Sequence, residues 1–477
     1  MKIKIFAAAA LAASLSMTSC NDDFLEKIPK TDLTEATAFL EYDNFKAFMY
    51  PCYALFTNTD IRTNFNNCVV QSQYYGDFYG GLVTNRDNSM NPYAYQNITQ
   101  TTSGGGWDFT YIRRINIMLS HLDDGVLNEA EAKHWRSVGY FFKAWWYMEL
   151  IDRFGDVPWV DNVINEGSEE TYGPRTPRAK VAENIISCLE YAAENIGNYD
   201  DGDNTITANA AKAALSRFLL REGTWAKYHG LDEPYEQYLA QCIEVSQDLM
   251  NQYPNLYMGT ESYPAAGYGE MWTTEDLHNV PGVIFYKQYV DGILMNRGND
   301  FEHIAAHNED VPQYTVDMFL MKNGLPIANP NSGYKGGKGK DMWDTFDNRD
   351  PRLYQNIQPP YVVAPNGGSV DGVSMFKTWK YLNAGDVVEG HTVTAEEATK
   401  YRTYMDYLGA NTQCLRGGTF GGTGMKRVPG QNWGASLTKN SPNLTDNSTT
   451  AYMRCRTGYY TWKHYDMWEF STGSSSY

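Results

Sequence analysis

The sequence predicts a mainly α-helical fold, in which paired helices form a scaffold and a large irregular, loop-rich lobe follows. Two observations support this prediction. Apolar residues recur at helical spacing in six segments before residue 254, and short polar stretches join most of these segments. Residues 254–470, in contrast, are dense in glycine, asparagine and proline and contain only short extended pieces, which is typical of turns and loops.

The six predicted helices span residues 43–56, 107–123, 129–155, 178–197, 208–228 and 232–253. The first keeps an apolar face although it contains Pro51, which lacks a backbone donor. The third is long and apolar, with Trp135 and Phe142 along it, and Gly155 followed by Pro158 is a helix stop signal. Helices joined in this way pack as antiparallel pairs, and a series of such pairs is tetratricopeptide-like.

The chain is expected to have three parts. Residues 1–19 are a predicted leader, and residues 20–253 form the helical part, which a polar loop insertion at 57–106 interrupts. Residues 254–477 form the loop-rich part. Loops of this length within a compact protein are usually functional or mobile, so we expect ligand contacts to come from them.

The leader has the features of a secretory signal. Lys2 and Lys4 precede an apolar run at residues 5–17, which is about 20 Å long as a helix at ~1.5 Å per residue. That length is too short for a bilayer core of ~30 Å. The small residues before Cys20 resemble a bacterial lipoprotein box, which implies that Cys20 is acylated and begins the mature chain. An ordinary signal peptide with an incidental cysteine is the alternative.

Composition excludes several classes of function. Hydrophobic content of 42% with 20% charged residues is globular. The net charge of −18 argues against nucleic-acid binding and against direct binding to anionic lipid, because the chain has no basic stripe. We therefore expect the lipid on Cys20 alone to hold the protein at a membrane.

The cysteine pattern also argues against a metal or redox site. The chain has seven cysteines and no CxxC pair, so neither a zinc ribbon nor a thioredoxin-type site is predicted. Cys188 and Cys242 fall on the apolar faces of predicted helices, which favours buried free thiols. Disulfides remain open as an alternative, because an exported protein can form them.

No motif in the chain predicts catalysis or a cofactor. HIAAH at 303–307 lacks the glutamate of a zinc peptidase, since Ile304 stands at that position; an adventitious or structural metal is the alternative. The glycine-rich runs at 333–340 and 416–427 do not fit a phosphate loop, and no GxSxG elbow occurs. We therefore predict no catalytic residue, no cofactor and no metal site.

Aromatic residues in the loops are the best candidates for ligand contacts. The chain has 12 Trp, 36 Tyr and 20 Phe, and many stand among Asn and Asp in loop-like stretches. A flat ring can stack on a sugar, and neighbouring amides and carboxylates can bond its hydroxyls. The alternative is that these rings pack the loops onto the helices. The candidate binding residues are Tyr75, Tyr79, Asn85, Asp87, Tyr93, Tyr268 and Trp272.

Several strings along the chain resemble one family. They include DFLEKIP (23–29), WDFTYIRRINIML (107–119), GDVP (155–158), KNGLPI (322–327) and FDNRDPRL (346–353). As an ordered set they resemble the SusD/RagB family of outer-membrane lipoproteins of Bacteroidota, and residues 21–23 resemble the acidic surface-export signal of such lipoproteins. GDVP and the Asp350-Pro351-Arg352 turn look structural.

The resemblance implies a tetratricopeptide-like helical scaffold with an irregular lobe. It implies a surface lipoprotein, without catalysis, that binds an oligosaccharide and covers a SusC-like TonB-dependent transporter. Binding of peptides or amino acids, as in the RagB branch, is the alternative, and a secreted hydrolase is a weaker one.

The chain also departs from the family. After a segment such as residues 458–466 the family continues into a further helix pair, whereas this chain ends at Tyr477. Either the chain is a fragment or the final helix pair is lost. An array without its terminal unit exposes an apolar face, so we expect poor solubility or low stability of the chain as given.

Overall fold

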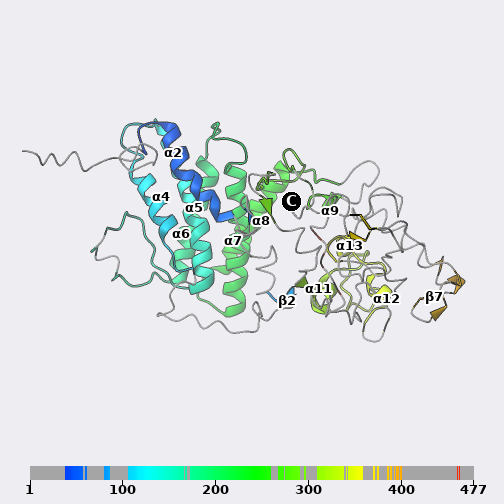
Figure 1. The fold of residues 1–477 in the computed structure, drawn as a ribbon. Coiled ribbons are helices and arrows are strands. Elements are labelled where there is room, and N and C mark those ends of the chain that lie inside the picture. The colour runs from blue at the N-terminus through cyan, green and yellow to red at the C-terminus, as the bar shows by residue number, and fades with distance from the viewer. Residues whose placement is uncertain are drawn as a thin grey trace, which may run out of the picture. The chain divides into compact units, whose positions relative to one another are not determined.

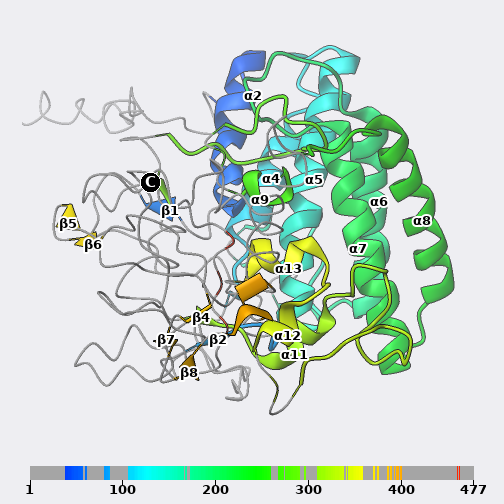
Figure 2. The ribbon, with the colours of Figure 1, turned by 90° about the vertical axis from the view of Figure 1, so that its right-hand side faces the viewer.

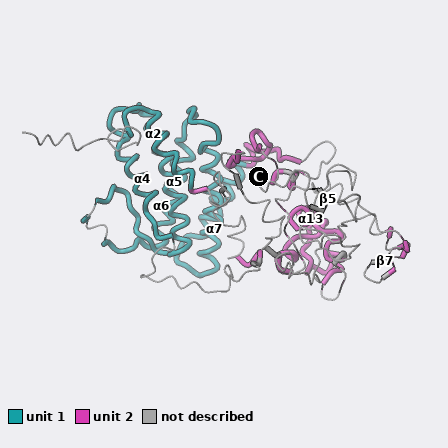
Figure 3. The backbone as a smooth tube through the Cα atoms, viewed as in Figure 1, with its two compact units in different colours: residues 1–54, 104–249 teal, residues 55–103, 250–477 magenta. Residues whose placement is uncertain are grey.

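The protein is mainly helical, as predicted, and its chain divides into two compact units. The first unit comprises residues 1–54 and 104–249, and the second comprises residues 55–103 and 250–477 (Figure 3). The computed structural model describes residues 38–56, 60–61, 80–85, 106–165, 167–168, 172–258, 267–272, 274, 276–290, 295–296, 309–337, 340, 342–357, 369–370, 373–374, 384–385, 387–388, 391–392, 394–396, 398–399, 459, 461 and 463.

The helices of the first unit lie side by side (Figure 1; Figure 2). They are α2 (Tyr42–Met49), the 3₁₀ helix η2 (Tyr50–Phe56), α4 (Thr110–Ser120), α5 (Glu129–Phe154), α6 (Arg178–Asn195), α7 (Ala208–His229) and α8 (Tyr235–Gln252). The last residues of η2 and α8 fall in the second unit. All six predicted helical segments are confirmed, with ends within three residues of those expected.

The segment at 43–56 is one feature where the structure differs from the prediction. It is not a single α-helix, because α2 ends at Met49 and a 3₁₀ helix continues to Phe56. Pro51 has no N–H to donate to a carbonyl in the preceding turn, and its ring crowds that turn. The apolar face survives the change, since Phe45, Met49 and Cys52 are all buried.

The long helix α5 begins and ends where its sequence signals lie. The Asn128 side chain caps it by accepting a hydrogen bond from the Glu131 N–H at 3.0 Å, and the Glu131 carboxylate accepts one from the Asn128 N–H at 2.8 Å. At the other end Gly155 has φ +67°, a conformation that favours glycine. The GDVP string therefore ends this helix, as predicted.

α5 is the centre of the first unit. It packs most extensively against α6 and also against α4, and α6 packs against α7. Gly139 faces α4 so closely that a Cβ built there would lie 2.6 Å from Cε of Met118. On α7, Ala211 and Ala214 are buried, and these small side chains allow neighbouring helices to approach.

A buried ion pair links three helices of this unit. Arg178, at the start of α6, donates two hydrogen bonds of 2.7 Å to the carboxylate of Glu222 on α7. It also donates to the carbonyl of Ile151 near the end of α5 at 2.8 Å. Glu222 is 0% exposed, so its charge depends on Arg178 and on Arg221, whose Nη2 lies 3.1 Å from Oε2.

The described part of the second unit consists of short elements. Its helices are α9 (Gly267–Glu270), α11 (Gln313–Met318), α12 (Met342–Phe346) and α13 (Pro351–Asn356). Its two-residue strands form antiparallel pairs: β1 (Asp60–Ile61) with β3 (Met295–Asn296), β2 (Thr84–Asn85) with β4 (Glu309–Asp310), β5 (Ser369–Val370) with β6 (Val373–Ser374), and β7 (Val387–Val388) with β8 (His391–Thr392).

Arg349 connects two of these short helices. Its Nη1 donates to the Thr345 carbonyl in α12 at 2.8 Å. Its Nη2 donates to the carbonyls of Val316 and Phe319, at the end of α11, at 2.6 and 2.7 Å. Arg349 is 0% exposed. It therefore satisfies carbonyls that a helix end would otherwise leave unpaired.

The cysteines that the structure describes are buried free thiols, namely Cys52, Cys188 and Cys242. Burial raises the pKa of the Cys52 thiol to about 12, and it does the same for Cys188. The expectation of buried thiols at Cys188 and Cys242 is confirmed. Within the described ranges, no helix is both long and apolar enough to cross a membrane.

Candidate functional site

The second unit contains a cavity of about 390 Å³. Residues just before β2, the helices α9, α11 and α13, and two residues near the end of the chain contribute to its walls. Its apolar lining consists of Leu82, Val83, Val311, Met318, Phe319, Leu320 and Ile357. Its polar lining consists of Tyr268, Thr315, Asp350, Arg352, Asn356, Thr461 and Lys463. The cavity thus combines an apolar wall with hydrogen-bonding groups, as small-molecule sites do.

An aspartate–arginine pair forms part of the wall. Asp350 caps α13 by accepting from the Arg352 N–H at 2.9 Å, and Pro351 takes the first helical position. The Arg352 side chain then bonds the same carboxylate, with Nε 3.0 Å from Oδ1 and Nη2 2.5 Å from Oδ2. Burial raises the pKa of Asp350, but the hydrogen bonds from Arg352 outweigh it, so the pKa lies below its ordinary value.

Tyr268 and Asn356 connect α9 to α13 at the cavity. The Tyr268 hydroxyl lies 3.4 Å from Oδ1 of Asn356 and donates to it. The Asn356 amide in turn donates to the Arg352 carbonyl at 2.7 Å, which fixes its orientation. The phenol and the amide therefore present a defined set of polar atoms to a ligand.

Trp272 stands next to Tyr268 and carries a cation on one face of its ring. The two rings meet edge to face, with centroids 5.9 Å apart and planes at 72°. Nζ of Lys463 lies 3.6 Å from the centroid of the Trp272 ring, which is direct contact. Trp272 is 37% exposed, so part of its surface is accessible.

Thr461 contributes a buried hydroxyl to the same wall. It pairs with Ile357 in an isolated antiparallel bridge and is 4% exposed. Among the residues described, none bonds its Oγ1. An unpaired buried hydroxyl costs about 1–3 kcal/mol, and a ligand hydroxyl in the cavity is one partner that would recover this free energy.

The structure brings together some of the residues predicted from sequence. Tyr268 lines the cavity, and Trp272 contacts Tyr268. Asn85 lies in β2, opposite Glu309 and two residues beyond Val83 in the cavity wall. The other candidates lie outside the described residues, namely Tyr75, Tyr79, Asp87, Tyr93 and the lipidation candidate Cys20.

Sequence reasoning missed the polar residues near the end of the chain and on α13. Arg352 stands in an Asp-Pro-Arg string, which we interpreted only as a structural turn; that capping role is real, and the side chain also lines the cavity. Lys463 follows an aromatic run, but only its contact with Trp272, far away in sequence, shows its importance. No local signal indicates such a contact.

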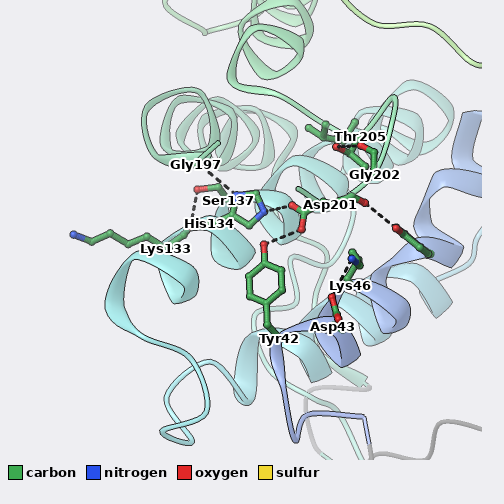
Figure 4. A network of polar contacts seen from close by, with 12 residues as sticks. Tyr42, Asp43, Lys46, Lys133, His134, Ser137, Gly197, Asp201, Gly202 and Thr205 are labelled. Carbon is green, nitrogen blue, oxygen red and sulfur yellow. Dashed lines mark hydrogen bonds and ion pairs between the residues drawn. The ribbon is translucent and has the colours of Figure 1, made fainter. Parts of the chain in front are cut away.

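A second polar cluster, in the first unit, is structural and not a ligand site (Figure 4). Nε2 of His134 lies 2.7 Å from Oδ2 of Asp201, and the Tyr42 hydroxyl donates to Oδ1 of Asp201 at 2.8 Å. The N–H of Gly197 donates to Nδ1 of His134. The adjoining cavity has only about 10 Å³, which is room for no more than one water molecule.

Of the motifs that we judged inert on sequence, the glycine-rich run at 333–340 is the one that lies partly within the described residues. HIAAH at 303–307 and the glycine-rich run at 416–427 lie outside the described residues. Within the described part of the chain, no group of His, Cys, Asp or Glu is arranged to hold a metal ion.

The comparisons with known proteins find SusD-like proteins. Residues 23–220 match the SusD-like family described as "Starch-binding associating with outer membrane". The chain is 30% identical to SusD-like protein P2 of Formosa agariphila over 112 residues, which is 24% of this chain and 21% of that protein. It is 24% identical to a SusD-like protein of Bacteroides ovatus over 283 residues, 54% of this chain and 47% of that protein.

The chain thus spans less than half the length of either of these relatives. Among solved structures, a SusD-like carbohydrate binding protein from Bacteroides fragilis matches with a TM-score of 0.50 and 17% identity. The match covers 76% of this chain and 67% of that one. At this identity the likeness shows a shared fold.

Proposed function

Because this chain belongs to the SusD/RagB family, we propose that it binds oligosaccharides in the cavity of its second unit and releases them unchanged. The observation that supports this most is the combination of two aromatic rings, Tyr268 and Phe319, with an apolar wall and fixed polar groups around one cavity. A sugar has the same division, with apolar C–H faces and a rim of hydroxyls.

The polar groups are suited to hydroxyls. Arg352 offers donors fixed by its bond to Asp350, and the Asp350 carboxylate offers acceptors. Asn356 and Tyr268 add groups that both donate and accept. Neighbouring hydroxyls of a sugar need donors and acceptors in this kind of proximity.

The proposed setting is the outer membrane. A lipid on Cys20 would hold the protein at the cell exterior, where it would pass captured oligosaccharide to a SusC-like TonB-dependent transporter. The family description places its members at the outer membrane, which supports this setting. Purification of the lipidated protein from outer membranes should retain such a transporter, and its absence under mild detergent would count against the partnership.

Affinity gels and isothermal titration against a panel of oligosaccharides test the binding. We expect Tyr268→Ala and Asn356→Ala each to weaken binding about tenfold, as the loss of a stacked ring or a ligand hydrogen bond does. Tyr172→Ala is the matched control, because Tyr172 is exposed and lies in the first unit. The same incubations should show no shortened product.

Retention on no glycan, with binding of a cationic peptide instead, would replace the proposal with the peptide alternative. That alternative predicts an acidic pocket. In the described lining of the cavity Asp350 is the one carboxylate, and Arg352 already pairs with it. The described lining of the cavity is therefore not the acidic pocket that the peptide alternative predicts.

A further inference from the structure

The end of α11 leaves two aliphatic side chains uncovered at the cavity of the second unit. Met318 is 54% exposed and Leu320 is 37% exposed, and both line the cavity. A lone exposed apolar side chain is ordinary on a protein surface. Two in the wall of one cavity instead indicate a ligand that covers apolar surface there. Neither side chain has a ring face on which a sugar could stack, or a group that could bond a hydroxyl.

The backbone holds this part of the wall in place. The carbonyl of Phe319 accepts a hydrogen bond from Nη2 of the buried Arg349 at 2.7 Å. The carbonyl of Leu320 accepts one from the Asp350 N–H at 2.9 Å. The two aliphatic side chains therefore extend from a backbone that is fixed on both sides of Phe319, and this backbone is bonded directly to the first residue of the Asp-Pro-Arg turn.

That turn supplies a hydrogen-bond donor to the same cavity. Arg352 bonds the Asp350 carboxylate through Nε and Nη2, which fixes the guanidinium. Its Nη1 has no hydrogen-bond partner among the described residues, and its side chain is 59% exposed. A guanidinium nitrogen only donates, so the ligand group that pairs with Nη1 must be an acceptor.

A plain sugar and an acetylated sugar would meet this wall differently. A hydroxyl placed against Met318 and Leu320 loses its water and gains no partner. The methyl of an acetyl group gains free energy from burial at the same place, and the acetyl carbonyl accepts a hydrogen bond from Arg352. A methyl ether or a deoxy sugar provides the methyl without the carbonyl. Of these groups, acetyl alone matches both the aliphatic side chains and the donor.

We infer that the oligosaccharide bound in this cavity carries an acetyl group, which Met318 and Leu320 receive through its methyl and Arg352 through its carbonyl. The inference rests on the proposed function and narrows it to a class of glycan. An ester-linked and an amide-linked acetyl group share this chemistry, so the experiment tests both.

The test compares neutral ligands that differ in acetylation. Naturally O-acetylated xylo- and manno-oligosaccharides are each paired with the same material after mild alkaline removal of the acetyl groups, and N-acetylated chito-oligosaccharides are paired with cello-oligosaccharides of equal length. Isothermal titration should show that at least one acetylated ligand binds the wild-type protein about tenfold more tightly than its partner, as burial of a methyl group with one hydrogen bond provides.

Variants of Met318 assign the preference to the aliphatic wall. Met318→Gln keeps an unbranched side chain and makes its end polar, so it should reduce the preference by about threefold while the ligand without acetyl binds as before. Met318→Leu stays apolar and should retain the preference. Met250→Gln is the matched control, because Met250 is 64% exposed and does not line the cavity.

A variant of Arg352 tests the donor. Arg352→Lys keeps a positive charge beside Asp350 but lacks the second terminal nitrogen of the guanidinium. It should therefore weaken the acetylated ligand more than the ligand without acetyl. An equal loss for both ligands would show that Arg352 does not contact the acetyl carbonyl, and would overturn that part of the inference.

The remaining outcomes separate the inference from the proposed function. Equal binding of every acetylated ligand and its partner overturns the inference and leaves the proposed function standing. If Met318→Gln weakens both members of a pair alike, Met318 does not receive the acetyl group and the inference fails. If no oligosaccharide binds at all, the proposed function itself fails, and the inference fails with it.

Discussion

At the scale of single residues, the stability of the first unit depends on buried charged side chains. Asp201 accepts hydrogen bonds from His134 and from Tyr42 at the interface of several segments of the first unit. Burial raises the pKa of Asp201, but the hydrogen bonds from these partners together lower it by more. The pKa of Asp201 therefore lies below its ordinary value. The folded state therefore favours the ionised carboxylate.

Asp201→Asn should lower the free energy of unfolding by about 2 kcal/mol at pH 7, because an amide accepts weaker bonds from the same donors. A lowered pKa contributes stability that is complete above the unfolded value of ~3.9 and is lost as the pH falls towards the folded value. The difference between wild type and variant should thus shrink below about pH 4. Urea unfolding followed by circular dichroism measures this difference in the free energy of unfolding at pH 7 and at pH 3.

Asp123→Asn is the control for this experiment, because the Asp123 side chain is 90% exposed. Its free energy of unfolding should match that of wild type at pH 7. A difference between wild type and Asp201→Asn that stays constant from pH 7 to pH 3 would contradict the assigned role of the carboxylate.

The pair of Arg178 and Glu222 gives a second prediction at this scale. Glu222→Gln should lower the free energy of unfolding by about 3 kcal/mol or more, because it leaves a largely buried guanidinium without its counter-charge. Glu183→Gln removes an exposed partner of Lys180 and should cost less than about 0.5 kcal/mol. Similar losses in the two variants in chemical denaturation would show that burial is not what matters here.

At the scale of elements, the close contact between α4 and α5 depends on the absence of a side chain at Gly139. The atom nearest to a Cβ at this position is the terminal methyl of Met118, which is flexible. Leu119 and Ile115 of α4 also lie within 4 Å of this position, so the contact offers little free space.

Gly139→Ala should change stability by less than about 1 kcal/mol, because Met118 can move and alanine favours the helix. Gly139→Val should cost about 2 kcal/mol, since its two additional methyl groups crowd Leu119, whose Cδ2 already lies 3.1 Å from a Cβ at this position. Thermal melts of both variants provide the measurement. Met118→Ala added to Gly139→Val should restore part of the loss; no restoration would mean that Met118 is not the obstacle.

Much of the helical scaffold is predictable from sequence because its signals are local. The capping box at Asn128, the stop at Gly155 and the apolar spacing of α5 act within a few residues of each other. The cavity is less predictable, because its parts come from distant segments. Tyr268 and Trp272 form one short aromatic string and were found, whereas Lys463 lies almost two hundred residues beyond the ring that it contacts.

At the scale of the whole molecule, the proposed anchor and the proposed binding site are separate features of the chain. The proposed anchor would depend on Cys20 alone, whereas the cavity is lined by residues of the second unit. Changes to one should therefore leave the other intact.

Cys20→Ala should release the mature protein from the membrane fraction and leave its affinity for oligosaccharide unchanged. Fractionation of expressing cells, with detection of the protein by antibody, measures the first effect, and titration of the released protein measures the second. Cys188→Ala removes a buried thiol instead and should remain with the membrane. Continued membrane attachment of Cys20→Ala would exclude the lipid as the sole anchor.

The two units are interleaved along the chain, since residues 55–103 belong with residues 250–477. A ribosome therefore delivers β1 long before its partner: Asp60 pairs with Asn296, which is synthesised more than two hundred residues later. At ~5–20 residues per second this delay is on the order of ten to fifty seconds. During this delay β1 has no partner strand, while the helices of the first unit are still being synthesised. A chaperone that protects this early part of the second unit must therefore remain bound for at least that long.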